Sequence, residues 1–178
     1  MAQICSQSLK GMSLDCSTSQ GGIKKVWIAD YSTVTVTKPT TGETITKNDI
    51  TMSGDTKFYG YEFRRGTSSM NHTHTADETT GNNYVSTELS LVFTKMDTAK
   101  RIEMAALSVG QLAVIVLDSN GVYWYLGSDD YVSASAGGGE TGAAKSDRNA
   151  YTITLKTESS TYPYEIEKEA VATLIDAE

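Results

Sequence analysis

Apolar and polar side chains alternate most regularly in the stretch YVSTELSLVF, residues 84–93. On an extended chain, one side would carry Val85, Thr87, Leu89, Leu91 and Phe93, and the other side Tyr84, Ser86, Glu88 and Ser90. Alternation of this kind predicts a strand with one face buried and the other in water.

Five further stretches predict strands: KKVWIAD (24–30), TVTVT (33–37), KFYGYEFRR (57–65), the hairpin QLAVIVLDSNGVYWYLG (111–127) and AYTITLKT (150–157). In the hairpin, Asn120-Gly121 favours a tight turn. Its first strand is apolar on both faces from Ala113 to Leu117, so we expect it at the centre of a sheet. The terminal segment YEIEKEAVATLIDAE fits one more strand or a short helix.

The stretch TKMDTAKRIEMAALSVG, residues 94–110, has a helical pattern instead. Its apolar stripe consists of Met96, Ala99, Ile102, Ala106 and Val109. We expect Thr94 to cap the helix with Asp97 completing a capping box, and Gly110 to form a left-handed cap at the other end. The pattern predicts a helix over residues 95–109 that packs its stripe on a sheet, as a lid over one side of the central hairpin.

These elements predict a mainly β fold: an antiparallel β-sandwich or open barrel with one flanking α-helix (residues 95–109). We expect a single domain over residues 1–178 with an N-terminal extension at about 1–22. Two polar stretches, 66–83 and 128–149, contain few large apolar residues and are expected to be long loops. Loops of that length in a small domain usually carry function or contact another molecule.

Charge and hydropathy narrow the class of protein. The chain has 15 basic and 22 acidic residues, a net charge of −7, and its basic residues do not cluster, which disfavours tight binding to nucleic acid. No secretion signal and no membrane-spanning segment is expected from the apolar runs. We expect Cys5 and Cys16 to be reduced thiols, because two cysteines in a chain without an export signal rarely form a bridge.

Two motifs invite a nucleotide-binding interpretation that we reject. Gly137, Gly139 and Gly142 match G-x-G-x-x-G, but that fingerprint must open a helix and a strand follows here. In the same run, Ala143-Ala144 separates Gly142 from the lysine and serine that a phosphate-binding loop needs next to it. No cofactor is expected.

The stretch HTHTADE holds the only cluster of potential metal ligands in the sequence. His72 and His74 would lie on one side of an extended chain, with Asp77 and Glu78 close behind. They are weak candidates for a metal site at a subunit interface, and a solvated loop is favoured because a third anchored ligand is missing. No serine or cysteine lies in a recognisable nucleophile motif, so we expect no enzyme.

Five aromatic residues, Tyr59, Tyr61, Tyr123, Trp124 and Tyr125, are candidates for a platform that stacks on sugars or bases. Core packing and cross-strand pairing is the favoured interpretation. The aromatic platform keeps a carbohydrate-binding or adhesin module open as an alternative. A metal-dependent enzyme that would use His72 and His74 is a second alternative.

The order of these parts resembles the tail tube proteins of tailed bacteriophages. The segments LKGMSLDCSTSQGGIKKVWIADY and TELSLVFTKMDTAKRIEMAALSVGQLAVIVLDSNGVYWYLG are also similar to virion proteins of phages that infect gut Bacteroides-type bacteria. The resemblance spans most of the chain and rests on architecture, without a signature residue. Neck, terminator, connector and hub ring proteins of phages share much of that fold and are alternative identities.

The resemblance implies a non-enzymatic virion protein, made in the bacterial host cytoplasm and assembled into the viral tail. Its partners would be itself, in stacked homo-hexameric rings, and other tail or neck proteins. DNA would touch the lumen only in passing, and no membrane would be involved. We expect the assembly contacts in the polar stretch after residue 65, at Gly66, Ser69, Met70, His72, His74, Asp77, Glu78, Asn82 and Asn83.

Overall fold

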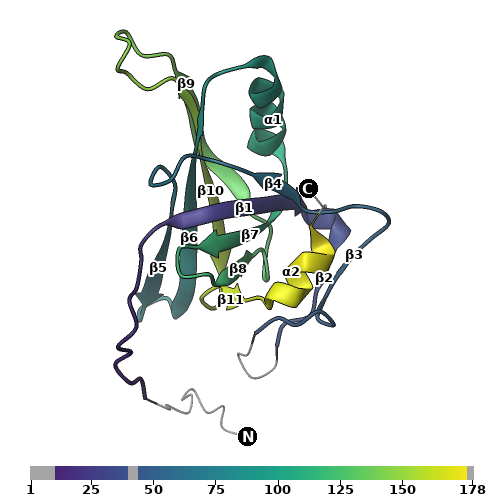
Figure 1. Cartoon of the computed structure of the whole chain (residues 1–178). Helices are drawn as coiled ribbons and strands as arrows, with labels where there is room; N and C mark the ends of the chain where they lie inside the picture. The colour runs from purple at the N-terminus through teal and green to yellow at the C-terminus, as the bar shows by residue number, and fades with distance from the viewer. Residues whose placement is uncertain (1–10, 40–43, 176–178) are drawn as a thin grey trace, which may run out of the picture.

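The computed structural model describes residues 11–39 and 44–175, which form two facing antiparallel sheets with helices outside them (Figure 1). The five-stranded sheet has the order β11 (Tyr164–Glu165), β8 (Tyr123–Leu126), β7 (Leu112–Asp118), β1 (Ile23–Asp30) and β4 (Tyr59–Tyr61). The four-stranded sheet has the order β5 (Ser69–Asp77), β6 (Asn82–Thr94), β10 (Ala150–Ser159) and β9 (Ser133–Glu140). The predicted mainly β, sandwich-like fold is confirmed, and the sheets do not close into a barrel.

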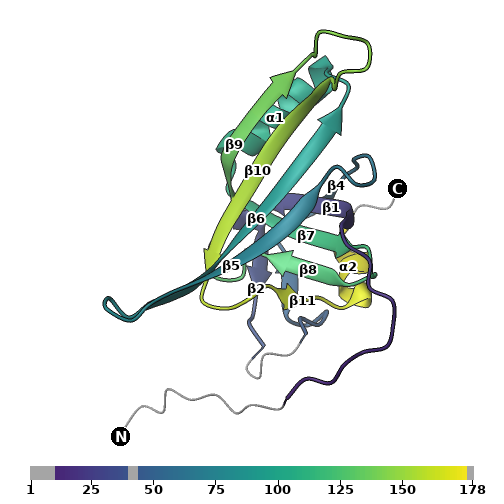
Figure 2. The ribbon, with the colours of Figure 1, turned by 90° about the vertical axis from the view of Figure 1, so that its left-hand side faces the viewer.

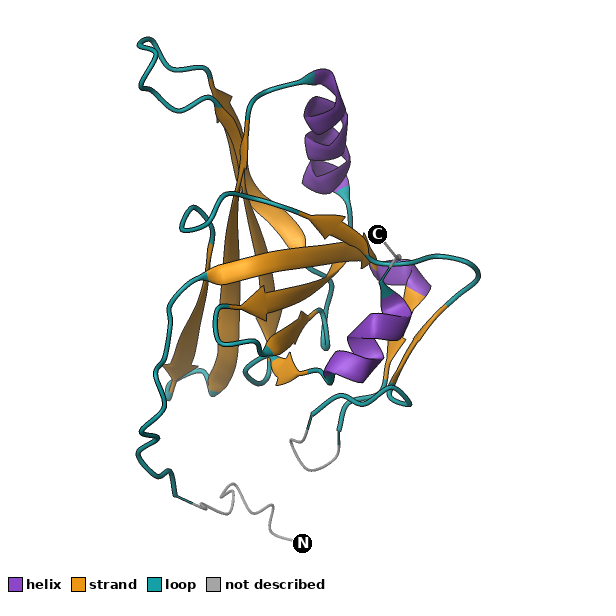
Figure 3. Ribbon diagram, in the orientation of Figure 1, coloured by secondary structure: helices purple, strands orange, loops and turns teal. Residues whose placement is uncertain are grey.

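A short 3-10 turn, a two-stranded sheet and two helices complete the fold (Figure 3). A 3-10 turn, η1 (Tyr31–Thr33), leads into the two-stranded sheet of β2 (Val34–Val36) and β3 (Ile50–Met52). The helices are α1 (Thr98–Val109) and α2 (Lys168–Leu174). The terminal segment thus supplies both a short strand, β11, and a helix, the two outcomes that its sequence allowed.

Strand β7 is the centre of the five-stranded sheet, as its doubly apolar pattern predicted. Leu112, Val114 and Val116 point into the core between the two sheets. Ala113 and Ile115 point to the opposite face, into a second core with α2 and the two-stranded sheet. The apolar run of β7 is therefore explained by burial on both sides.

The core between the sheets contains the predicted inward residues of β6. Val85, Thr87, Leu89, Leu91 and Phe93 are all less than a tenth exposed. In the pairing of β6 with β10, they lie opposite the inward side chains of β10, such as Leu89 opposite Leu155 and Leu91 opposite Ile153. Alternation in both strands sets this register, since a slip by one residue would expose every one of these side chains.

The helix that covers the central hairpin is α2, and the expectation that the helix at 95–109 would do so is wrong. Ala170, Val171 and Leu174 of α2 are buried against the outer face of the five-stranded sheet. Helix α1 instead lies against β9 and β10, where the four-stranded sheet extends past the other sheet (Figures 1 and 2).

Helix α1 also begins later and ends differently than predicted. Its N-cap is Asp97, whose carboxylate accepts a hydrogen bond from the Lys100 amide at 2.8 Å, while Thr94 is the last residue of β6. Gly110 has φ −74°, so it is not a left-handed cap. A Cβ atom at residue 110 would lie 2.9 Å from Leu112 Cδ2, and this close approach explains the glycine.

The stripe that was expected to face a sheet is largely exposed. Leu107 is the buried residue of α1, and Met104 packs beside it on the same core. Ile102 is 57% exposed and Val109 is 85% exposed, and Ala99 and Ala106 are exposed as well. The helix therefore packs through a narrower face, one position away from the predicted one.

The two expected loops contain strands instead. Residues 66–83 form most of a long hairpin, in which β5 pairs with β6 from Ser69–Ser90 to Asp77–Asn82. Residues 128–149 include β9, which pairs along β10. The polar composition of these segments is typical of loops, but both are edge strands, where water covers one side of the strand and few apolar side chains are needed.

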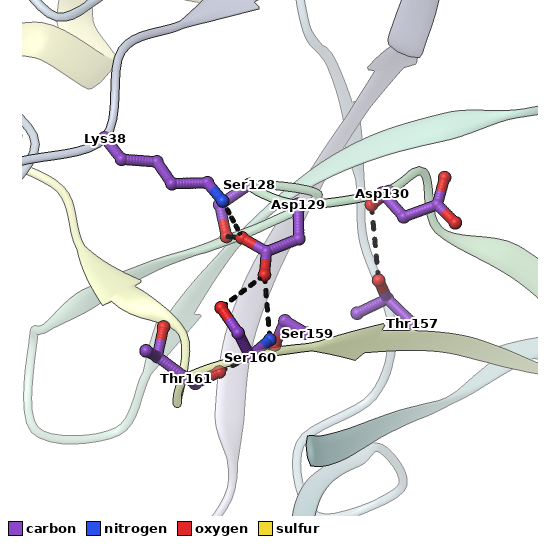
Figure 4. Close-up of polar contacts among 8 residues, drawn as sticks. All are labelled: Lys38, Ser128, Asp129, Asp130, Thr157, Ser159, Ser160 and Thr161. Carbon is purple, nitrogen blue, oxygen red and sulfur yellow. Dashed lines mark hydrogen bonds and ion pairs between the residues drawn. The ribbon is translucent and has the colours of Figure 1, made fainter. Parts of the chain in front are cut away.

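An ion pair fixes the connection between the two sheets (Figure 4). Asp129 follows β8, and its carboxylate binds Lys38 Nζ as well as the amide and hydroxyl of Ser160, at 2.8 Å and 2.6 Å. Burial alone would raise the pKa of Asp129, but the hydrogen bonds from Lys38 and Ser160 outweigh it and hold the pKa at about 2. The carboxylate thus joins the segment after β2 to the end of β10.

Cys16 is an exposed free thiol, and Cys5 lies outside the described residues. Residues 11–22 contain no helix or strand and precede β1. No helix in the described part of the chain has the length and apolar character needed to cross a membrane.

Candidate assembly surfaces

The four-stranded sheet ends in two open edges, β5 on one side and β9 on the other. Among residues 11–39 and 44–175, each of these strands pairs with a single neighbour, β5 with β6 and β9 with β10. Seven of the nine residues of β5 and the last six residues of β9 are exposed. Long exposed edges present backbone N–H and C=O groups that another strand can pair with.

The outer face of this sheet is polar, and its charged residues are mostly acidic, with Glu88 and Glu158 beside Lys156. It carries hydroxyl and amide side chains from three strands: Asn71, Thr73, Thr75, Ser86, Ser90, Thr152 and Thr154. Within the four strands, Lys156 is the one cation, and its ammonium binds the Glu158 carboxylate at 2.8 Å. The face therefore offers little to hold a phosphate.

Two hairpin tips project from opposite ends of the same sheet (Figure 2). At one end, the pairing of β6 with β10 stops at Val85, so the residues from Thr75 to Tyr84 extend as a two-stranded ribbon. At the other end, the fully exposed residues 141–149 connect β9 to β10. The expected interface residues Asp77, Glu78, Asn82 and Asn83 all lie in the first tip.

The β5–β6 tip makes several hydrogen bonds within itself. The Asp77 side chain accepts from the Thr79 amide at 2.8 Å and from the Thr80 amide at 3.3 Å, and these bonds lower its pKa. Gly81 has φ +73°, a left-handed conformation that suits glycine, and its amide donates to the Asp77 carbonyl. The tip is a defined turn that another molecule can contact.

The remaining expected interface residues lie along β5 or in the turn just before it. Gly66 lies in the turn before β5, with φ +76°. Ser69 is on the outer face of the sheet, whereas Met70, His72 and His74 are on the inner face, because they pair with Leu89, Thr87 and Val85. The structure thus gathers the predicted residues on one hairpin but divides them between two faces and a tip.

The two histidines do not converge on a common point. His72 Nδ1 lies 3.0 Å from Thr87 Oγ1, its ring meets Tyr162 edge to face, and burial lowers its pKa. His74 Nε2 lies 2.6 Å from Asn83 Oδ1. Residues 11–39 and 44–175 contain no group of three or more metal-binding side chains, so nothing in the geometry favours a metal site here.

The five aromatic residues considered as a stacking platform also lie apart from one another. Tyr125 is buried in the core beneath α2, and Tyr123 lies 6.0 Å from Trp27, measured between ring centroids. Tyr59 and Tyr61 are on β4, at the far edge of the same sheet. They do not form one exposed platform for a sugar or a base.

Sequence reasoning missed two surfaces. The first is the β9 edge, because SASAGGGE has no large apolar side chain to reveal alternation. The second is a groove of about 450 Å³ between α1 and β4. We call this the α1–β4 groove; the aromatic spacing of Tyr59 and Tyr61 was its one signal in the sequence.

No family model matches the chain, and no curated protein matches it significantly.

Proposed function

We propose that this chain is a non-enzymatic structural subunit of a bacteriophage tail tube, which assembles into rings that stack into a conduit for DNA. The observation that carries the proposal is the pair of open edges, β5 and β9, on one four-stranded antiparallel sheet. The place of assembly would be the virion tail, and the place of synthesis the bacterial host cytoplasm.

The even number of strands matters for ring closure. Neighbouring strands alternate in direction, so β5 and β9 run in opposite directions. When β5 of one copy lies beside β9 of the next, the contact is antiparallel, and the sheet continues without interruption. A head-to-tail contact of this kind closes into a ring when the rotation between copies permits, and it leaves no edge of the four-stranded sheet exposed.

The outer face of the sheet supports a lumen. In a ring closed through these edges, one face of the continuous sheet lines the hole, and the other face of each sheet is already covered by its own five-stranded sheet. The hydroxyl-rich outer face has a single lysine within the four strands, and that lysine is bound to Glu158. DNA would pass such a surface with few cationic contacts to hold it.

Stacking would use the two hairpin tips. Because they leave the sheet at opposite ends, the β5–β6 tip of one ring meets the 141–149 end of the next. Neck, terminator and hub rings would use the same edges, so they stay as the second candidate within the same class.

Electron microscopy and native mass spectrometry of the purified full chain over a range of concentrations test the proposal. Rings or tubes of one stoichiometry are expected. Monomer at every concentration, without particles in the presence of other virion proteins, would contradict it.

A pair of proline variants tests the edge directly. In an antiparallel strand, the N–H groups of two consecutive residues point to opposite neighbours. Of Gly137→Pro and Gly138→Pro in β9, one removes an N–H that points away from β10. That variant should keep the wild-type melting temperature and form no rings, since proline is tolerated on an edge but blocks further pairing. Rings from a normally folded variant of this kind would show that the β9 edge is not used.

A further inference from the structure

The α1–β4 groove is open and largely apolar, with Glu62, Lys100 and Glu103 also in its lining. Strand β4 contributes Tyr59 and Tyr61, β6 contributes Phe93, and α1 contributes Met104 and Leu107. The Tyr61 hydroxyl donates to Glu103 Oε2 at 2.9 Å, a bond that links β4 to α1 across the groove, and burial raises the pKa of Tyr61. Tyr59 remains 60% exposed. The groove thus presents aromatic and aliphatic surface in a fixed shape.

The groove also borders a strand edge that is unpaired along Tyr59–Tyr61 within the described residues, although Phe58, just before β4, pairs with Ile175. Strand β4 pairs with β1 on one side and is the last strand of the five-stranded sheet on the other. An extended peptide placed beside β4 can therefore add a strand to the sheet and insert alternate side chains into the groove.

The chain itself carries a segment with the matching properties. Residues 11–20, which we call the arm, contain no helix or strand and are exposed throughout. Met12 and Leu14 in the arm are 103% and 92% exposed. In an extended chain, residues two apart project to the same side, so these two apolar side chains can enter one groove together.

The arm is directed away from the groove of its own domain. The Gln20 amide donates to Asn120 Oδ1 at 2.8 Å, and the Ser119 amide donates to the Gly22 carbonyl at 3.0 Å. Both contacts hold the base of the arm at the turn between β7 and β8, and β7 and β1 separate that turn from β4 in the sheet. The arm then runs toward the end of the molecule opposite α1 (Figures 1 and 2).

From these observations we infer that the arm of one copy binds in the α1–β4 groove of a second copy, as a strand added to β4 with Met12 and Leu14 in the groove. Ser13 and Asp15 face away from the groove. The inference rests on the proposed function only in requiring that copies of the chain meet. It assigns to the assembly a contact separate from the β5 and β9 edges.

Disulfide trapping between two populations of the full chain tests this inference. The first population has Cys5→Ser and retains Cys16, which lies on the same side of an extended arm as Leu14. The second population has Cys5→Ser, Cys16→Ser and one new cysteine at either end of β4, Tyr59→Cys or Tyr61→Cys, both of which line the groove. A matched control places the cysteine at exposed Lys47, on the β2–β3 connection.

We expect the mixed populations to form a disulfide dimer with one of the two β4 positions, about tenfold or more faster than with Lys47→Cys, because binding raises the effective concentration of the thiols. The position that reacts gives the direction of the arm. Equal rates at β4 and at Lys47 would overturn the inference, since the arm would then be an unbound tail.

Arm variants supply the second readout. Leu14→Asp in the first population should lower the trapping rate by about tenfold, because it places a charge in an apolar groove. Ser13→Asp, one residue away on the opposite side of the arm, should leave the rate within about twofold. Equal effects of both variants would overturn the inference.

A chain that carries both Cys16 and the β4 cysteine distinguishes an arm that binds its own copy from an arm that binds a second copy. A disulfide that forms only inside that chain, with no dimer from the mixture, would overturn the exchange. Rings in electron micrographs without trapping would reject the arm contact and leave the proposed function intact. Trapping without rings would support the arm contact and contradict the tail tube.

Discussion

Gly139 lies opposite Tyr151 in the pairing of β9 with β10, so close that a Cβ atom at residue 139 would come within 2.8 Å of the Tyr151 ring. Met96 Cε, next to α1, would be 3.0 Å away. At Gly138, the next residue, no atom lies within 4 Å of such a Cβ. The glycine run thus has a packing role at one position and none at its neighbour.

We therefore expect opposite effects from two alanine substitutions. Gly139→Ala should lower the free energy of unfolding by about 1–3 kcal/mol, because Tyr151 and Met96 must move. Gly138→Ala should leave it unchanged or raise it by up to about 1 kcal/mol, since alanine restricts the unfolded chain. Urea denaturation of the two proteins measures both. Equal destabilisation would contradict the packing argument.

The burial of α1 gives a second prediction. Leu107→Ala should cost about 2–5 kcal/mol, the usual range for a buried leucine. Ala106→Asp should be nearly silent for folding, because Ala106 is exposed, whereas the predicted stripe would have buried it. Thermal melting of both variants is the measurement. Unfolding by Ala106→Asp together with tolerance of Leu107→Ala would show that the helix packs through its other face.

The Asp129 carboxylate gives a dependence on pH. Its pKa is about 2 in the folded protein, below the ordinary value of 3.8, so the stabilisation it provides is complete above that ordinary value and is lost as the pH falls toward 2. Asp129→Asn should lower the free energy of unfolding by about 2–3 kcal/mol at pH 7, and less at pH 2. Denaturation curves at several pH values test this.

Glu78→Gln is the matched control for the pH experiment. Glu78 lies on the exposed hairpin tip, away from the ion pair, and its substitution should leave the free energy of unfolding within about 0.5 kcal/mol at each pH. A constant difference between Asp129→Asn and the wild type from pH 7 to pH 2 would show that the ion pair does not determine the stability of the connection.

Shortening the β5–β6 tip separates folding from stacking. Thr75 and Tyr84 face each other in the ladder, so residues 76–83 can be replaced by Asn-Gly as a two-residue turn. The melting temperature should change by only a few degrees, because the removed residues lie beyond the last pairing with β10. Tubes should be lost in electron micrographs while rings remain. Intact tubes would show that the tip is a solvated feature without a stacking role.

Replacing the whole stretch 66–83 by a flexible linker would be a poorer experiment. It removes β5, which pairs with β6 over its full length. Loss of tubes would then follow from loss of an edge strand as well as from loss of the tip, and the two causes could not be told apart.

The parts of the fold that the sequence predicted are those in which burial imposes a period. Leu89 and Leu91 alternate with Glu88 and Ser90 because one face of β6 is in the core, and the register with β10 follows from it. The β7–β8 hairpin was predictable for a related reason, since an apolar run before Asn120-Gly121 fits a central strand and a tight turn.

The parts that sequence reasoning missed are edges and exposed surfaces, where burial imposes little. Strand β5 needs few apolar residues because water covers one of its sides, so its Thr-rich sequence resembled a loop. In α1, the apolar pattern contains two adjacent stripes, and Leu107 rather than Ala106 faces the sheet. Periodicity predicts that the helix has an apolar face, but contact with the neighbouring strands determines which of two similar faces is buried.

For the candidate site, the sequence located the hairpin but not its partner. The expected interface residues from Ser69 to Asn83 do lie together on β5 and its tip. The β9 edge and the α1–β4 groove arise from pairing between distant segments, such as β9 with β10 and β4 with β1. Local sequence patterns do not predict pairings between segments that lie far apart in the chain.

The two hairpin tips differ in sequence and leave the sheet at opposite ends, and this has a consequence for growth. A stack joined by unlike surfaces is a polar filament, with one end that displays the β5–β6 tips and another that displays residues 141–149. New rings would then add at each end through a different surface, and growth at the two ends need not be equally fast. A protein that recognises only one tip would stop elongation at one end and leave the other end free.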